Sequence, residues 1–147
     1  MQEEPRDVKP SIYDEDFTID QVREAFNHDR YATQTLEPEI IEAAPGHAVV
    51  RMRIFDMHRN ALNAVMGGAI YTLADFALAI ATNVGQSPTV TVSSTAEYLS
   101  VAKGSWLTAT CDADKKGRTL VFATCDVRDD LGVHVARVTS SCLRVQR

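Results

Sequence analysis

Residues 59–83, RNALNAVMGGAIYTLADFALAIATN, decide how the rest of the chain is organised. After the pair Gly67–Gly68 the stretch is apolar and rich in alanine, and Asp75 is the only charged residue within 60–96. This composition predicts a long helix over about 66–83, because a helix that is apolar all round is buried on nearly every side. A lone carboxyl and a glycine pair in such a helix both need an explanation.

Both features suit catalysis. Gly67 and Gly68 would lie at the helix N-terminus, where backbone N–H groups have no intrahelical acceptor and glycine lets a ligand approach closely. Asp75 follows Gly68 by seven residues, which places both on nearly the same helix face but about 10.5 Å apart along the axis. A base and a polarised carbonyl must act on one water, so a single helix cannot readily supply both. Two copies of the helix packed antiparallel can.

Strand patterns lie on both sides of the helix. Alternating apolar residues and turn sequences predict a hairpin before it and four antiparallel strands after it, with a meander as the simplest pairing, over residues 35–44, 47–55, 89–99, 106–113, 119–128 and 133–145. One long helix wrapped by a curved antiparallel sheet of five to six strands is the hotdog fold, in the α+β class. One sheet leaves a side of the helix uncovered, so we expect at least a dimer.

The N-terminal region divides into two parts. Residues 1–17 are charged, contain two prolines and show little periodicity, which predicts a flexible or loosely docked arm. A short helix over 19–27, capped by Thr18 or Asp20, then begins a single domain that spans 18–147.

Bulk composition excludes several functions. The chain has 147 residues, 45% of them apolar, and a net charge of −5, which argues against a nucleic-acid surface. No uncharged apolar run is long enough to span a membrane, and the acidic N-terminus is unlike a signal peptide. Cys111, Cys125 and Cys142 are widely spaced in strand patterns, so we expect buried thiols in a reducing cytoplasm. The four histidines form no metal constellation.

The segment around the long helix resembles the signature of hotdog-fold acyl-CoA thioesterases of the phenylacetyl-CoA type. That signature reads approximately Asn-x5-His-Gly-Gly-x4-Leu-Ala-Asp-x-Ala. It aligns with Asn60, Met66-Gly67-Gly68, Leu73-Ala74-Asp75 and Ala77. The similarity extends over roughly residues 26–145, and its Gly-Gly-x4-Leu-Ala-Asp part is fairly specific.

The resemblance implies an enzyme that hydrolyses an acyl-CoA substrate to the free acid and CoA without a metal or a cofactor. Gly67 and Gly68 would polarise the thioester carbonyl through their N–H groups. Asp75 would act as general base, or alternatively as a nucleophile, and Asn60 would orient the water or the carbonyl. The family's site is shared across a dimer interface, so a second copy is the expected partner, and a dimer of dimers is favoured.

One position departs from the family pattern. Met66 stands where the family has His or sometimes Gln, and a thioether cannot donate a hydrogen bond. His58, eight residues away in the preceding loop, could compensate as a donor, but we expect it to face solvent. Met66 itself is a substrate-binding candidate. The further candidates are one aromatic residue, three hydroxyl residues and two cations, namely Phe76, Ser93, Ser94, Thr95, Lys103 and Arg118. Each of these also has an ordinary structural explanation.

Three other functions stay open. A non-catalytic acyl-CoA-binding module would account for the missing histidine. A hotdog hydratase or dehydratase would need a histidine paired with the acid, and none lies near the start of the helix. A purely structural dimer would share only the architecture.

Overall fold

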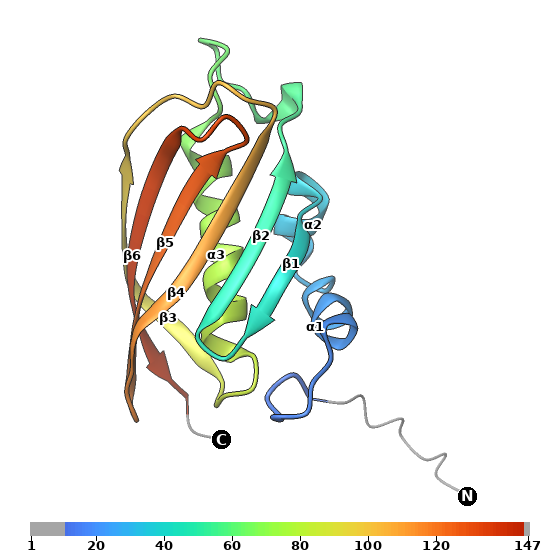
Figure 1. The fold of residues 1–147 in the computed structure, drawn as a ribbon, viewed down its shortest axis with the longest axis vertical. Coiled ribbons are helices and arrows are strands. Elements are labelled where there is room, and N and C mark those ends of the chain that lie inside the picture. Colours follow the sequence, from blue (N-terminus) through green and yellow to red (C-terminus); the bar gives the residue numbers. More distant parts are fainter. Residues whose placement is uncertain (1–10, 146–147) are drawn as a thin grey trace, which may run out of the picture.

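The structure, a computed structural model, describes residues 11–145. One long helix, α3 (Gly67–Asn83), lies against one face of a six-stranded antiparallel sheet (Figure 1). This arrangement confirms the α+β hotdog fold that the sequence predicts. Among residues 11–145, no helix is both long enough and apolar enough to cross a membrane.

The sheet has the strand order β1-β2-β4-β5-β6-β3. Its strands are β1 (Glu39–Ala44), β2 (His47–Arg53), β3 (Thr89–Tyr98), β4 (Trp106–Lys116), β5 (Leu120–Asp129) and β6 (His134–Arg144). The predicted meander holds for β4, β5 and β6 but is wrong for β3, which pairs with β6 and not with β4. The reason is that α3 carries the chain across the sheet, so β3 begins at the far edge. Residues 99–105 then bring the chain back to β4 beside β2 (Figure 1).

The core lies between α3 and the sheet. Alternate residues of the central strands face the helix and are fully or almost fully buried, for example Leu107 and Ala109 on β4 and Val121 and Ala123 on β5. The three cysteines are buried and free, as expected for small apolar side chains.

Two short helices precede the sheet, α1 (Ile19–Phe26) and α2 (Arg30–Leu36). Of the two predicted caps, Thr18 and Asp20, the structure uses Thr18, which caps α1 through a capping box. The predicted start of the first strand at residue 35 is wrong, because α2 continues to Leu36 and β1 begins only at Glu39. Leu36 packs in the core, and Glu37 then takes a left-handed conformation with φ 47°. That residue ends the helix and redirects the chain into the strand.

Part of the predicted N-terminal arm, residues 1–10, lies outside the described residues. The part from 11 to 17 lies against the end of α3, where the Gly85 N–H donates to the Ile12 carbonyl at 2.7 Å. Gly85 has φ 65°, and a Cβ there would come within 2.8 Å of Pro45 Cγ. Glycine is therefore required at this helix end on both counts.

One stripe of α3 is left open. Its members are exposed or half-buried and recur every three or four residues, which is the spacing of one helix face: Gly68, Tyr71, Thr72, Asp75 and Ala79. The adjacent edge strand β3 has no neighbour on its outer side among the described residues, and it exposes Val90 and Val92 by 50% and 65%. A single sheet therefore leaves one side of the helix uncovered, as we expect from the sequence.

Candidate active site

The first turn of α3 presents two free backbone donors. Met66 is the N-cap, and its carbonyl accepts hydrogen bonds from the N–H groups of Ala69 and Ile70 at 3.0 and 3.2 Å. The N–H groups of Gly67 and Gly68 have no acceptor among residues 11–145. With the positive end of the helix dipole behind them, these two groups can bind a carbonyl oxygen or an anion.

The two glycines have different surroundings. A Cβ added at Gly67 would lie 3.1–3.3 Å from the ring and hydroxyl of Tyr98. A Cβ at Gly68 would meet only Met66 Cε, at an ordinary 3.8 Å. Gly67 therefore makes room for a side chain of the same subunit, whereas the space over Gly68 is open.

Asn60 closes the loop that leads into α3. Its Oδ1 accepts hydrogen bonds from the N–H groups of Leu62 and Ala64 at 3.0 and 3.1 Å, and Asn63 takes a left-handed φ of 61°. The oxygen of the Asn60 carboxamide is thus engaged within the loop. Its NH2 group is left as a donor.

Asn60 and Gly67 line the same pocket of about 430 Å³, which we call the glycine pocket. The other lining residues are mostly apolar and come from the start of α3 and from the segment after β3: Ala64, Val65, Ile70, Tyr98, Leu99, Ser100, Val101 and Ala102. The pocket therefore combines an apolar wall with a few donors at one end, which is typical of a ligand site.

Asp75 lies on the open stripe of α3, two turns beyond the glycines and outside the glycine pocket. Its carboxylate has no hydrogen-bond partner among the described residues, and the neighbouring Thr72 hydroxyl donates instead to the Gly68 carbonyl at 2.8 Å. Although Asp75 is exposed on this stripe, the partial desolvation of its carboxyl by the surrounding apolar residues raises its pKa, and the negative charge of Asp29 raises it further. A structural acid would have a bonded partner, and this one is free to accept a proton.

Met66 and His58 occupy different environments from each other. Met66 is 56% exposed beside the glycines. His58 is buried, so the expectation that it faces solvent is wrong. Its Nδ1 accepts from the Phe55 N–H at 3.0 Å, so Nε2 carries the proton and donates to the Thr35 carbonyl at 2.6 Å. Both ring nitrogens brace the loop, and His58 does not replace the family histidine.

The three hydroxyl candidates on β3 do not share a face. Ser94 faces α3 and forms a hydrogen bond with the Ser140 hydroxyl at 2.7 Å. Ser93 and Thr95 pair with Ser141 and Thr139, whose row lies on the opposite face of the sheet.

Thr91 is a further candidate for a substrate-binding hydroxyl on β3, and the sequence alone does not reveal it. A β-bulge between Thr91 and Ser93 shifts the alternation, so Thr91 pairs with the buried Cys142 on the side of α3, and the Cys142 thiol lies 3.9 Å from the Thr91 hydroxyl. Strict alternation counted back from Tyr98 would have put Val92 there. Only the bulge reveals the hydroxyl.

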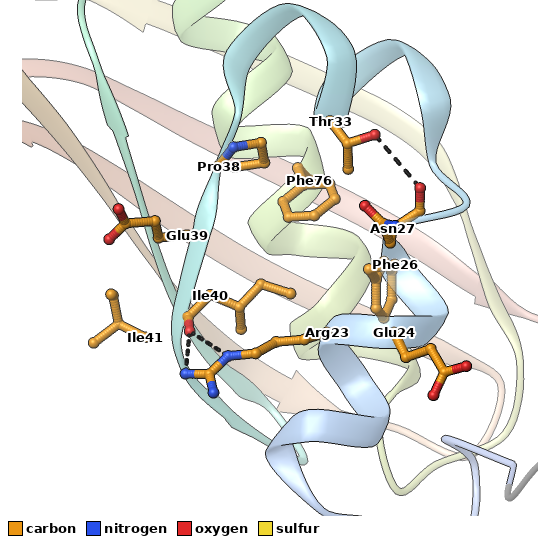
Figure 2. Close-up of a pocket in the computed structure, with 10 residues that line it drawn as sticks. All are labelled: Arg23, Glu24, Phe26, Asn27, Thr33, Pro38, Glu39, Ile40, Ile41 and Phe76. Carbon is orange, nitrogen blue, oxygen red and sulfur yellow. Dashed lines mark hydrogen bonds between the residues drawn. The ribbon is translucent and has the colours of Figure 1, made fainter.

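Phe76 lies on another flank of α3, away from the glycine pocket. Its ring meets Phe26 edge to face, with centroids 5.8 Å apart, at the base of a pocket of about 610 Å³ between α1, α2 and β1 (Figure 2). Arg23 spans this pocket to donate two hydrogen bonds to the Ile40 carbonyl. Within one chain Phe76 packs against the N-terminal helices and does not line the site of Gly67.

The two proposed CoA-binding cations lie at opposite ends of the molecule. Lys103 follows directly after the residues that line the glycine pocket, in the segment just before β4, and Arg118 lies in the turn after the other end of that strand. The strand is about 33 Å long at 3.3 Å per residue. One chain cannot bring both cations to one CoA phosphate.

Comparisons with known proteins agree with this architecture. A family model described as the thioesterase superfamily matches residues 62–136. Human acyl-coenzyme A thioesterase 13 is 32% identical over 91 residues, which is 60% of this chain and 65% of that protein, so the match spans less than two thirds of this relative's length.

Two solved structures share the fold. The PaaI protein of the E. coli phenylacetic acid degradation operon superposes with a TM-score of 0.79 at 24% identity, covering 86% of this chain and 92% of that one. A hypothetical thioesterase from Streptococcus pneumoniae, solved with coenzyme A, gives 0.77 at 24% identity and covers 84% and 97% of the two chains.

Proposed function

The chain belongs to the thioesterase superfamily, and from that premise we propose that it hydrolyses an acyl-CoA thioester to the free acid and CoA. The name of the human relative and the coenzyme A held by the similar streptococcal protein support this substrate class. One observation carries the proposal: α3 holds a carboxylate and two N–H groups that have no partner among residues 11–145, and the rest of that described range leaves its exposed stripe open.

The donors act on the thioester carbonyl. The Gly68 N–H, with Gly67 beside it, donates to the carbonyl oxygen, and the helix dipole favours the negative charge that develops there. Asn60 lines the glycine pocket together with Gly67, and its NH2 group supplies a further donor. Together these groups stabilise the oxyanion of the tetrahedral intermediate.

Asp75 acts on the water. Its carboxylate removes a proton as the water oxygen bonds to the carbonyl carbon. The carbon–sulfur bond then breaks, the CoA sulfur takes up a proton, and the free acid leaves. The raised pKa makes Asp75 a stronger base than an ordinary exposed aspartate. No step needs a metal or a redox cofactor.

The site is shared between two copies of the chain. Gly68 and Asp75 are about 10.5 Å apart along α3, so the base of one helix serves the glycines of an antiparallel second helix. The open stripe of α3 and the unpaired edge of β3 are the surfaces that this second copy covers. We therefore propose a homodimer, assembled further into a dimer of dimers, that acts in the cytoplasm.

The test is CoA release from a panel of short, medium and aromatic acyl-CoAs. Asp75→Asn keeps the size of the side chain but removes the base, and we expect a loss of about 10²- to 10⁴-fold in kcat. Asp16→Asn changes an exposed carboxyl that lies outside the site and has no ion-pair partner among the described residues, so this variant serves as control and keeps the wild-type rate. Full activity in Asp75→Asn would refute the role of Asp75.

A second candidate function follows from Met66. Because a thioether stands where a donor is expected, the chain could hold acyl-CoA without cleaving it. Binding of CoA or acyl-CoA, measured by calorimetry, with no turnover of any thioester in the panel would favour this binding module and overturn the proposed hydrolysis.

A further inference from the structure

Tyr98, the last residue of β3, contacts the backbone of the glycine pair directly. Its hydroxyl donates a hydrogen bond to the Gly67 carbonyl at 3.1 Å, across 31 positions of sequence. Its ring would lie only 3.1–3.3 Å from a Cβ at Gly67, so a larger residue there would have to push the ring aside. Gly67 has an ordinary negative φ, so the backbone conformation itself does not demand glycine. The close approach of the Tyr98 ring is what favours glycine here.

The hydrogen bond from Tyr98 to the Gly67 carbonyl also affects the neighbouring Gly68 N–H. The Gly67 carbonyl and the Gly68 N–H belong to the same planar peptide group and point in opposite directions. Gly67 is the first residue of α3, so the helix already restrains this peptide group, and a second donor on the carbonyl restrains the direction of the N–H further. It also polarises the peptide group, which makes the N–H a better donor, because hydrogen bonds in a chain strengthen one another.

We propose that Tyr98 is a positioning residue: it orients the Gly67–Gly68 peptide so that the Gly68 N–H points at the carbonyl oxygen of the substrate. Glycine is then needed at the two positions for different reasons. Gly67 accommodates Tyr98, and Gly68 admits the substrate. This inference rests on the proposed thioester hydrolysis, because the N–H is useful only where a carbonyl gains negative charge.

A positioning role for Tyr98 predicts an effect on kcat and almost none on KM. Tyr98→Phe keeps the ring and removes the hydroxyl, so we expect kcat to fall roughly 2- to 10-fold, the value of one ordinary hydrogen bond, with little change in KM. Tyr31→Phe on α2, where the side chain is 71% exposed, is the control and leaves both constants unchanged. If Tyr98 were only a wall of the glycine pocket, KM would rise and kcat would stay constant, which would overturn the proposal.

A double-mutant cycle tests the packing of Tyr98 on Gly67. In the wild type, Gly67→Ala displaces the Tyr98 ring and lowers kcat. In a Tyr98→Ala background the space is empty, and Gly67→Ala has no further effect. If the two losses simply multiply, Tyr98 does not act through Gly67 and the inference is wrong.

Amide resonances separate failure of this inference from failure of the proposed function. Tyr98→Phe should shift the NMR resonance of the Gly68 N–H and speed its hydrogen exchange, whether or not the protein hydrolyses a thioester. An unchanged Gly68 amide contradicts the positioning role. A shifted amide in a protein that turns over no acyl-CoA contradicts the proposed hydrolysis instead, and with it the catalytic use of Tyr98.

Discussion

Replacing Gly68 by alanine tests whether the space over this residue belongs to the substrate. A Cβ there meets no atom closer than 3.8 Å, so the variant has nothing to displace within the chain. Alanine is also a better helix former than glycine by about 1 kcal/mol. We therefore expect Gly68→Ala to fold normally, with a free energy of unfolding that is unchanged or higher by up to about 1 kcal/mol.

The activity of Gly68→Ala should fall, although its stability does not. The added methyl group occupies the position from which a thioester carbonyl approaches the Gly68 N–H. Loss of one oxyanion donor costs about 2.7–4 kcal/mol, which is a decrease of about 10²- to 10³-fold in kcat. A variant that is at least as stable as the wild type and at the same time far less active cannot be explained by misfolding.

Two measurements are needed, namely thermal or urea unfolding and the release of CoA detected with a thiol-reactive dye. The dye suits this protein because Cys111, Cys125 and Cys142 are all buried and react slowly. Unchanged kcat/KM in folded Gly68→Ala would refute the approach of the substrate to this residue. A loss of stability above about 1 kcal/mol would refute the open space over it.

Three further predictions concern charge and donors. Partial burial raises the pKa of Asp75, and the negative charge of Asp29 raises it further. Asp29→Asn should therefore lower this pKa and move the acid limb of the pH profile of kcat/KM to lower pH. An unmoved limb contradicts the coupling between the two carboxyl groups. His47 lies 2.6 Å from both Asp112 and Glu42, which raise its pKa, so its contribution to stability is present below about pH 6.5 and is lost as the pH rises through the raised value. In urea titrations His47→Gln should lower the free energy of unfolding at pH 5.5 but not at pH 9. The loss should be less than about 1 kcal/mol, because both ion pairs of His47 are largely exposed. An equal loss at both pH values rules this out. Met66→His restores a donor beside the glycines and should raise kcat, whereas an unchanged kcat would place residue 66 outside the chemistry.

The helix and its two chemical groups could be predicted from the sequence because their signals are local. A single charge in a long apolar stretch and a glycine pair at its start are visible without a structure. The seven-residue spacing then places Asp75 and Gly68 on one face of a regular helix. The structure has both on that face, and neither group has a partner within the described range 11–145.

The order of the strands and the faces of β3 could not be predicted in the same way. Pairing of β3 with β6 depends on where α3 delivers the chain, which is a property of the whole sheet. The bulge beside Val92 reverses the alternation below it, so Thr91 faces the helix in place of Val92. A bulge inserts one residue without a strong local signal, and a shift of one position exchanges the two faces.

The roles of His58 and Tyr98 could not be predicted from the sequence, because both depend on backbone groups that are distant along the chain. His58 donates to the Thr35 carbonyl, 23 residues earlier, and Tyr98 donates to the Gly67 carbonyl, 31 residues earlier. The sequence around each of them is ordinary loop or strand. Only the folded chain brings these acceptors to the side chains.

The central claim is that one active site takes Gly68 from one chain and Asp75 from another. Mixing Asp75→Asn protein with an equal amount of a Gly68→Val variant, after unfolding and refolding together, tests it most directly. Each variant alone should be inactive. In the mixture about half of the dimers are mixed, and each mixed dimer has one intact site, so about a quarter of wild-type activity should return. If both groups acted within one chain, every site in the mixture would lack one of them and no activity would return.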